Sequence, residues 1–539
     1  MNVPTNNITA MRRSEAALWF WSVVLAFTGL WILLPLLFHS GYKPDVIELQ
    51  CIGKEWVLAT RKHPMLPAWI LELINIFTNR SFVAPYIASA LCTGVTLLAV
   101  WRLARKVLSE RLALIGTFAM LPFWSITVES IQFNQNTVLM ACWTLTMLMF
   151  YNAFQTNRKR WWIAAGLTLG LGFHAKYTMI LLALALLLYS LWIPRFRRYW
   201  QETGPWLTVS LSCAVFLPHL IWLSSAGFAT TVSYALTQHY SPAMVFHVYY
   251  PFHWIVCWFG LIILSPIVLL IPSLGRKWKI RLPQSDIEQE TLQYFFCCIA
   301  FPIAAILLFS AVFAAGLIVA YGYPFCFFLG VYLLLRFQQQ DNAETFRRSF
   351  RWSAFAVFAM VGVFIIQAVG SPYLVGTARR FHFPMRELGA ECDRIWSNQY
   401  PDSPCMYTGG QWELAANAAY AMKNRPSVLF YYGGLEDPEG VPTGTWATDD
   451  DVNKKGGIIL WKASGPSEVR TELFPGIRLP QETVESWDLP VPDWVHRRFP
   501  RAEVLPEVIE LPYKTGADIP PLRIGIALVP PPSGESQSR

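Results

Sequence analysis

The sequence predicts an α-helical polytopic membrane protein of about 11 transmembrane helices with a C-terminal external α/β domain. Hydrophobic residues make up 54% of the 539 residues and charged residues only 14%, whereas soluble domains carry roughly 25% charged residues. The charge is also uneven, because 1–370 consists of apolar blocks between short basic clusters, while 371–539 has the mixed composition of a soluble domain. We therefore expect a membrane domain over 1–370 and an external domain over 371–539.

Eleven apolar blocks are predicted to form the helices. They lie near 16–38, 82–104, 112–128, 136–154, 161–173, 177–193, 206–224, 254–272, 292–312, 317–335 and 352–370. The first block is long enough to cross a bilayer, and no small-residue cleavage site follows it, which favours a retained helix over a signal peptide. The stretch 161–193 would reach roughly 50 Å as one helix, so we expect a hairpin of two short helices there.

The basic residues are distributed asymmetrically about these helices. With the N-terminus inside, the external loops hold six of them: Lys43, Lys54, Arg61, Lys62, Arg80 and Lys176. The inner segments hold 20: Arg12, Arg13, Arg102, Arg105, Lys106, Arg111, Arg158, Lys159, Arg160, Arg195, Arg197, Arg198, Arg276, Lys277, Lys279, Arg281, Arg336, Arg347, Arg348 and Arg351. This bias predicts a cytoplasmic N-terminus and an external tail, and it accounts for the net charge of +8 without a nucleic-acid partner.

The external tail alternates short strand-like and helix-like runs. The strand-like runs are Cys405–Thr408, Ser427–Tyr432, Gly457–Trp461 and Arg523–Val529, and the helix-like runs are Gln411–Met422 and Ser467–Leu473. This alternation is typical of a small α/β domain.

The first external loop, 39–81, is the longest and most polar segment between predicted helices. Pro44 can begin a helix in which Asp45 and Glu48 lie three residues apart on one face. The apolar face of this helix would consist of Val46, Ile47, Leu49, Ile52, Trp56 and Val57. We expect it to lie on the bilayer surface, followed by a second interfacial helix over Ala68–Phe77 that begins after Pro67.

If each polar residue of this loop is considered by itself, a structural role is enough to explain it. Asp45 could cap its helix, Glu48 could pair with Lys54, and Lys62 and His63 could contact lipid headgroups. The whole set favours a functional site, because interfacial helices usually carry Lys and Arg on the polar face rather than paired acids.

Four segments together resemble the bacterial glycosyltransferase family 39, a GT-C group related to protein O-mannosyltransferases and lipid A sugar transferases. They are D-x-x-E (45–48) with K-H-P-x-L-P-A-W (62–69), FNQNTVLMACW (133–143), FHAKYTMILL (173–182) and GGQWELAANAAYAMKNRPSV (409–428). Two departures stand out, because many relatives have Asp-Glu where this chain has Asp45-Val46, and His-Pro-Pro where it has His63-Pro64-Met65. The first departure favours Asp45 over Glu48 as the catalytic residue.

The resemblance implies a GT-C fold and transfer of a sugar, with inversion, from a polyprenyl phosphate to an acceptor hydroxyl outside the membrane. The leaving phosphate is already a stable anion, so the reaction needs one base and a cation rather than the two carboxylates of a glycosidase. We expect Asp45 to be the base, with Glu48 secondary. Lys62 and His63 are expected to hold the phosphate or to help a metal do so. The acceptor could be lipid A, lipopolysaccharide, another envelope glycan or a protein.

Lys176 is a further phosphate-binding candidate. Two helical arms of about 15 residues reach only roughly 23 Å, which would sink the turn at His174–Lys176 below the outer surface. A buried lysine is costly without a partner, and a lipid phosphate would pair with it, although snorkelling to the interface would also explain it.

Other polar residues could line the cavity that would hold the lipid phosphate: Glu129, Asn134, His174, His239 and Tyr240. A helix cap explains Asn134 equally well, and an aromatic belt is the commoner meaning of Tyr and His at 239–253. The sequence leaves a divalent metal open, since Asp45, Glu48, His63 and these histidines could meet only if the fold brings them together.

Two other classes of function compete with a glycosyltransferase. A transporter or flippase of lipid-linked sugars would use the same cavity and cations without chemistry, but it would often show internal repeats, and we find none. A scaffold of an envelope complex would leave the acidic first loop unexplained. The expected location is the bacterial inner membrane, with the N-terminus cytoplasmic and the C-terminal domain periplasmic.

Overall fold

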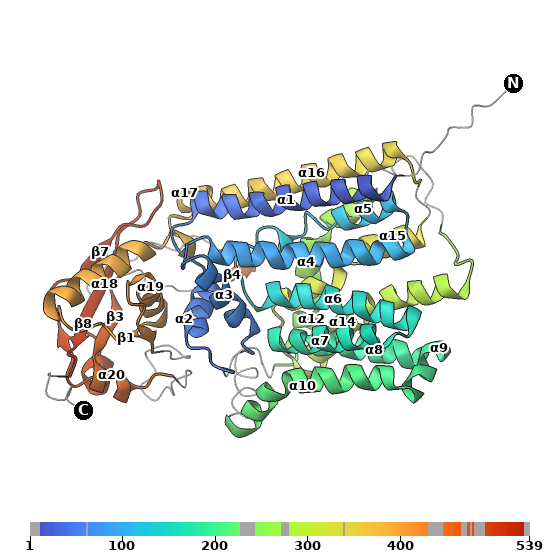
Figure 1. Cartoon of the computed structure of the whole chain (residues 1–539). Coiled ribbons are helices and arrows are strands. Elements are labelled where there is room, and N and C mark those ends of the chain that lie inside the picture. The colour runs from blue at the N-terminus through green and yellow to red at the C-terminus, as the bar shows by residue number, and fades with distance from the viewer. Residues whose placement is uncertain are drawn as a thin grey trace. The chain divides into compact units, whose positions relative to one another are not determined.

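The computed structural model describes residues 11–60, 63–226, 243–270, 280–337, 340–429, 446–464, 472–474, 477–478 and 491–532. The chain forms two compact units (Figure 1). The helical unit comprises Met1–Pro35, Arg61–Pro67 and Ser81–Phe364, and the sheet unit comprises Leu36–Thr60, Ala68–Arg80 and Ile365–Arg539. Most of the first external loop therefore folds with the C-terminal tail.

The helical unit consists of long apolar helices and shorter broken ones. In chain order they are α1 (Arg13–Phe38), α4 (Ala84–Val107), α5 (Glu110–Phe118), η1 (Trp124–Ile126), α6 (Gln135–Thr156), α7 (Lys159–Ala175), α8 (Met179–Trp192), α9 (Pro194–Arg197), η2 (Arg198–Gln201), α10 (Thr203–Ala226), α12 (Phe246–Ile262), α13 (Leu264–Leu270), α14 (Asp286–Phe313), η4 (Val319–Cys326), α15 (Leu329–Arg336) and α16 (Ala343–Ile365). Within the described ranges, six helices could cross a membrane, or eight if two bent pairs are each one span. The polytopic helical fold is confirmed, and the number of spans stays a prediction.

Two of the predicted apolar blocks contain breaks. The expected hairpin over 161–193 is present, because α7 ends at Ala175 and α8 begins at Met179. The expected single helix over 112–128 is wrong, because α5 ends at Phe118 and only the short η1 follows. Pro122 lies in this gap, and proline disfavours a helical conformation at the residue before it.

A mixed sheet forms the centre of the second unit. Its strands are β1 (Tyr407–Gly410), β2 (Ser427–Val428), β3 (Gly457–Ser464), β6 (Glu503–Val504), β7 (Ile509–Leu511) and β8 (Leu522–Val529). The strand order is β2-β1-β3-β8-β6, with β7 also paired to β8. Strand β1 is parallel to β2 and β3, with Tyr407 opposite both Ser427 and Gly457, and β8 is antiparallel to β3.

Helices cover both faces of this sheet. They are α18 (Met385–Gln399), α19 (Trp412–Ala421), α20 (Asp449–Lys455) and α21 (Asp493–Arg498). Alternate residues of β3 point to opposite faces, and accordingly Ile458 packs with Leu388 of α18, while Ile459 packs with Val495 of α21. The predicted α/β character of the tail is therefore confirmed.

Most of the predicted tail elements match helices or strands. Helix α19 lies within Gln411–Met422, and β1, β3 and β8 overlap their predicted runs. The predicted helix over Ser467–Leu473 is wrong at its end, because Glu472–Phe474 is β4, paired with β5 (Ile477–Arg478). Its earlier part, 467–471, lies outside the described residues.

Candidate active site

Asp45 lies in the first turn of α2 (Pro44–Lys54). Lys43 is the N-cap residue, and Pro44 begins the helix because its fixed φ suits the first helical position. The carboxylate of Asp45 is thereby placed near the positive end of the helix dipole. Asp45 is half-buried, and Glu48, one turn further on, is only 3% exposed. The predicted spacing of the two acids on one helix is confirmed.

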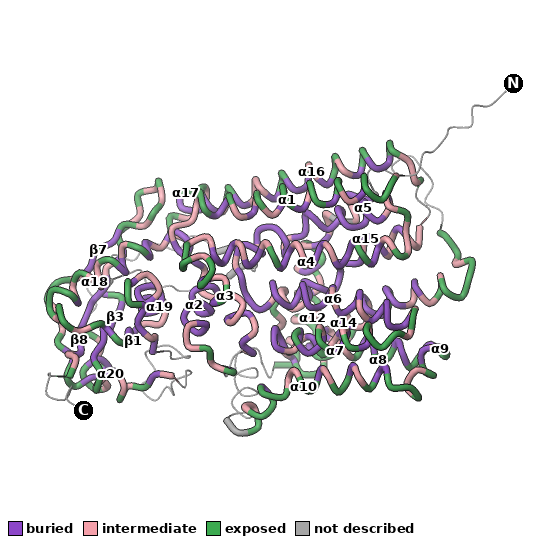
Figure 2. Tube along the Cα trace, viewed as in Figure 1, coloured by how far each residue is buried: buried purple, intermediate pink, exposed green. Residues whose placement is uncertain are grey.

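The rest of α2 is enclosed by protein. Every residue from Val46 to Gly53 is buried (Figure 2). The expected surface helix with one apolar face is therefore wrong for this segment. Trp56 does not extend that face, since the helix ends at Lys54 and Trp56 is 47% exposed. Asp45 is therefore the more exposed of the two acids.

Gly53 brings α2 against α3 (Leu66–Phe77). A Cβ at position 53 would lie 2.7 Å from the carbonyl oxygen of Ala68, closer than packed atoms come. Helix α3 begins one residue before Pro67, and it buries Leu71 while Phe77 is 86% exposed. An amphipathic α3 agrees with the expected second interfacial helix, whose contact with lipid stays a prediction.

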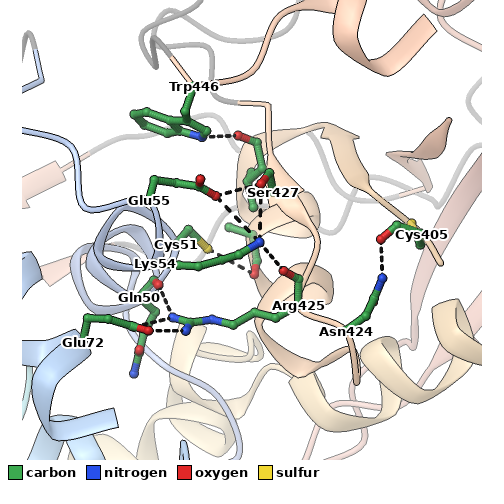
Figure 3. Close-up of polar contacts among 12 residues, drawn as sticks. Gln50, Cys51, Lys54, Glu55, Glu72, Cys405, Asn424, Arg425, Ser427 and Trp446 are labelled. Atoms are coloured by element: carbon green, nitrogen blue, oxygen red, sulfur yellow. Dashed lines mark hydrogen bonds and ion pairs between the residues drawn. The ribbon is translucent and has the colours of Figure 1, made fainter. Parts of the chain in front are cut away.

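Sequence reasoning missed a polar network that ties α2 and α3 to the tail (Figure 3). Two guanidinium nitrogens of Arg425 each donate to a carboxylate oxygen of Glu72 at 2.8 Å. Arg425 also donates to the backbone carbonyl of Gln50 in α2. One sequence feature pointed to this network: Glu72 is the only charged residue in the apolar run LPAWILELINIF and therefore needs a basic partner. That partner is Arg425, in the tail segment NRPS.

Lys176 is buried at the end of α7, with 8% of its surface exposed. Its ammonium donates to the side-chain carbonyl of Asn136 at 2.6 Å and lies 4.5 Å from the ring centre of Tyr321. Both contacts are with electrically neutral groups, and they hold the charged ammonium in an enclosed place. Such a charge attracts an anion strongly because the surrounding dielectric constant is low.

Two other candidates of the helical unit have structural contacts. Asn134 caps α6, since its side-chain oxygen accepts hydrogen bonds from the backbone N–H groups of Asn136 and Thr137 at 2.9 and 3.3 Å. His174 donates from Nε2 to the carbonyl of Val215 at 2.8 Å. These contacts give both residues a role in holding the helices.

Glu129 precedes α6 and is half-buried. Its carboxylate accepts a hydrogen bond from the side chain of Gln132. Sequence reasoning also missed His219, which is fully buried on α10 and shares a 2.7 Å hydrogen bond with the hydroxyl of Tyr177. His219 is a histidine inside an apolar block, and that was its signal in the sequence.

The candidate site residues belong to two different units. Asp45 and Glu48 belong to the sheet unit, while the helical unit contains His63, Glu129, Asn134, His174 and Lys176. The predicted residues Lys62, His239 and Tyr240 lie outside the described residues. Among the residues that are described, no group of three or more His, Cys, Asp or Glu side chains is arranged to hold a metal.

Two histidines at the start of the sheet unit have depressed pKa values. Burial, with smaller effects from Lys43 and His382, lowers the pKa of His39 to about 3, and burial also lowers the pKa of His382. The ring of His39 stacks on Phe381 at 4.4 Å. His382 donates from Nε2 to the Ala368 carbonyl at 2.7 Å and accepts the Arg379 N–H at Nδ1. The bond accepted at Nδ1 requires a neutral ring, because a protonated imidazole carries a hydrogen on both nitrogens.

We predict that the stability of this unit depends on these rings. The folded state resists protonation of His39, so the stability that this ring contributes is complete above about pH 6.5, the ordinary histidine pKa, and is lost as the pH falls towards 3. His382 acts in the same direction. The unfolding temperature in detergent should fall by several degrees between pH 7.5 and 4.5. His39→Phe should flatten this decline, and replacing the exposed His496 by Asn should leave it unchanged. Identical pH profiles for wild type and His39→Phe would contradict the assignment.

Residues 62–222 match a family model described as dolichyl-phosphate-mannose-protein mannosyltransferase. The chain is 24% identical over 198 residues to the undecaprenyl phosphate-alpha-4-amino-4-deoxy-L-arabinose arabinosyl transferase 1 of Pseudomonas fluorescens, covering 33% of this chain and 36% of the relative. It is 26% identical over 201 residues to the corresponding transferase of Pseudomonas aeruginosa, covering 34% and 36%. The matched region spans little more than a third of these relatives.

The fold is similar over nearly the whole chain to a solved protein. The structure of ArnT from Cupriavidus metallidurans bound to undecaprenyl phosphate superimposes with a TM-score of 0.60 at 13% identity, covering 96% of this chain and 98% of that one. The apo structure of the same protein gives a TM-score of 0.55 at 14% identity, with the same coverage. At these identities the similarity concerns the fold.

Proposed function

Because the chain belongs to the GT-C superfamily of membrane glycosyltransferases, we propose that it transfers a sugar from a polyprenyl phosphate to a hydroxyl of an envelope acceptor. The observation that supports this most is the setting of Asp45, a half-buried carboxylate at the start of an otherwise enclosed helix. The names of the relatives, which include undecaprenyl phosphate, support a donor of this class.

Asp45 acts as the general base in this proposal. The acceptor hydroxyl gives its proton to the carboxylate while its oxygen forms a bond to the anomeric carbon of the sugar. The bond between that carbon and the phosphate oxygen breaks from the opposite face, which inverts the anomeric configuration. No general acid is required, because the departing phosphate is a stable anion. Glu48, which is almost fully buried, is assigned a supporting role.

Lys176 pairs with the donor phosphate. Its ammonium is held in place by a hydrogen bond to Asn136 and by the ring of Tyr321. Charge-assisted hydrogen bonds of this kind are about twice as strong as neutral ones, and they gain further strength away from water. Lys62 and His63 are assigned to the same phosphate group on the basis of their positions in the sequence.

We further propose that the protein lies in the bacterial inner membrane with its N-terminus in the cytoplasm and its C-terminal domain in the periplasm. The bias of basic residues supports this orientation, because cytoplasmic loops retain Lys and Arg. The acceptor is then a molecule of the periplasmic side, such as lipid A, lipopolysaccharide, a glycan or a protein.

A deletion strain tests the proposal. Mass spectrometry of its envelope lipids and glycans should show the loss of one sugar and the accumulation of a polyprenyl-phosphate sugar. Wild-type protein should restore the sugar, and Asp45→Asn should not. Asp402→Asn is the matched control, since Asp402 is an exposed aspartate in a turn of the same unit, and it should restore the sugar fully. Full restoration by Asp45→Asn would favour a transporter of lipid-linked sugars instead.

A further inference from the structure

Arg425 is the most completely enclosed charged side chain of the network in Figure 3. It is 3% exposed and forms a two-pronged ion pair with Glu72 of α3, which is 5% exposed. Very little surface of this side chain remains for contact with a substrate. The role of Arg425 is therefore to hold parts of the protein together, and its contacts show which parts.

The backbone at Arg425 is unusual for an arginine. Its φ is +50°, in the left-handed region that favours glycine or asparagine. Backbone preference therefore does not explain an arginine at this turn between α19 and β2. The side chain explains the choice of arginine, because a long planar cation can donate hydrogen bonds both to Glu72 and to the Gln50 carbonyl from this turn.

The contacts of this turn converge on α2. The ammonium of Lys54, the last residue of α2, donates to the backbone carbonyl of Arg425. Ser427, two residues later, donates its hydroxyl to Glu55 at 2.8 Å. Together with the Gln50 contact, these bonds hold the C-terminal half of α2 to the start of β2.

A second set of contacts holds α2 to helix α19. The thiol of Cys51 contacts the Ala416 carbonyl at 3.6 Å. The ring of Tyr42, just before α2, lies 5.5 Å from that of Tyr420. Tyr420 in turn is 5.7 Å from the guanidinium of Arg425. An α-helix of 11 residues is stiff, so fixing its far end also fixes the direction of Asp45 in its first turn.

We propose that Arg425 is a positioning residue, which clamps α2 and α3 to the C-terminal domain and so sets the orientation of Asp45. This inference rests on the proposed function, in which Asp45 is the base. The directional ion pair specifies one arrangement of the two helices, which an apolar contact would specify less sharply. The C-terminal domain thus takes part in the reaction by fixing the geometry of the first loop.

The test compares Arg425→Lys with Arg498→Lys. Arg498 is a matched control, because it also forms a two-pronged pair, with Asp449 at 2.8 and 3.1 Å, but it joins α21 to α20. Each protein is purified in detergent and supplied with the lipid extract of the deletion strain, which contains both unused donor and unmodified acceptor. The unfolding temperature, kcat and the apparent KM for the donor are measured.

For Arg425→Lys we expect kcat to fall by about 10- to 100-fold, with an apparent donor KM within about twofold of wild type, because the displaced base acts only in the transition state. Arg498→Lys should keep kcat within about twofold even if its unfolding temperature falls equally. A kcat of Arg425→Lys within twofold of wild type would overturn the inference. So would parallel losses of kcat in both variants, which would show a general effect of stability.

Glu72→Gln gives a second route to the same result. It keeps the shape of the side chain and removes the charge, and it replaces Arg425→Lys if that variant does not fold. Its kcat should also fall at unchanged donor KM, and an unchanged kcat would overturn the inference. Wild-type protein that transfers no sugar would overturn the proposed function itself, whereas active wild type with an insensitive Arg425 or Glu72 variant overturns only the positioning role.

Discussion

Replacing Asp45 by asparagine should lower kcat by about 100- to 10,000-fold, the usual contribution of a general base. Asparagine has the same shape as aspartate, and position 45 is only half-buried, so the fold should be retained. The loss of a negative charge near the start of a helix costs only about 0.3–1 kcal/mol of stability. The large effect on the rate is therefore separable from any effect on folding.

The kinetic pattern of this variant is also specific. A base is used only as the proton leaves the acceptor, so kcat should fall while the apparent KM for the donor stays close to that of wild type. Glu48→Gln should lose less activity, because Glu48 is only 3% exposed. A kcat for Asp45→Asn within about threefold of wild type would rule out Asp45 as the base.

Replacing Lys176 by methionine should raise the apparent KM for the donor by about 10- to 100-fold, the equivalent of one charge-assisted hydrogen bond of roughly 1.5–3 kcal/mol. Methionine keeps the apolar stem of the side chain, so packing in the helical unit should change little. The apparent KM for the acceptor should not change. Steady-state rates over a range of donor concentrations check this expectation.

Asn136→Ala is the control for the Lys176 variant. It removes the 2.6 Å hydrogen bond to the ammonium but leaves the charge in place, so its donor KM should rise by less than that of Lys176→Met. An unchanged donor saturation curve for Lys176→Met would show that the lysine has no part in binding the phosphate. Equal losses in both variants would show that the hydrogen bond matters more than the charge.

The sequence predicts those features that depend on neighbouring residues. Apolar blocks predict the long helices because the bilayer requires about 20 apolar residues in a row. Pro44 marks the start of α2, and the excessive length of 161–193 predicts the break that the structure places between Ala175 and Met179. The α/β character of the tail likewise follows from the short alternating runs.

Other features depend on partners far away in the chain, and the sequence alone does not predict them. Arg425 and Glu72 are 353 positions apart, so neither residue indicates the other. The burial of α2 has the same origin, because the tail encloses a helix whose own composition suggested a surface helix. Asn134 was ambiguous for a local reason, since a cap and a cavity residue use the same side chain, and the hydrogen bonds to Asn136 and Thr137 assign it as a cap.

Sugar transfer by purified protein tests the central claim most directly. Wild-type protein in liposomes receives the deletion strain's lipid extract, and the polyprenyl-phosphate products are followed by mass spectrometry. We predict that the sugar leaves its lipid carrier, that free polyprenyl phosphate accumulates in equal amount, and that the sugar appears on an acceptor with inverted anomeric configuration. A donor that crosses the bilayer with its sugar still attached, with no free carrier formed, would contradict the account.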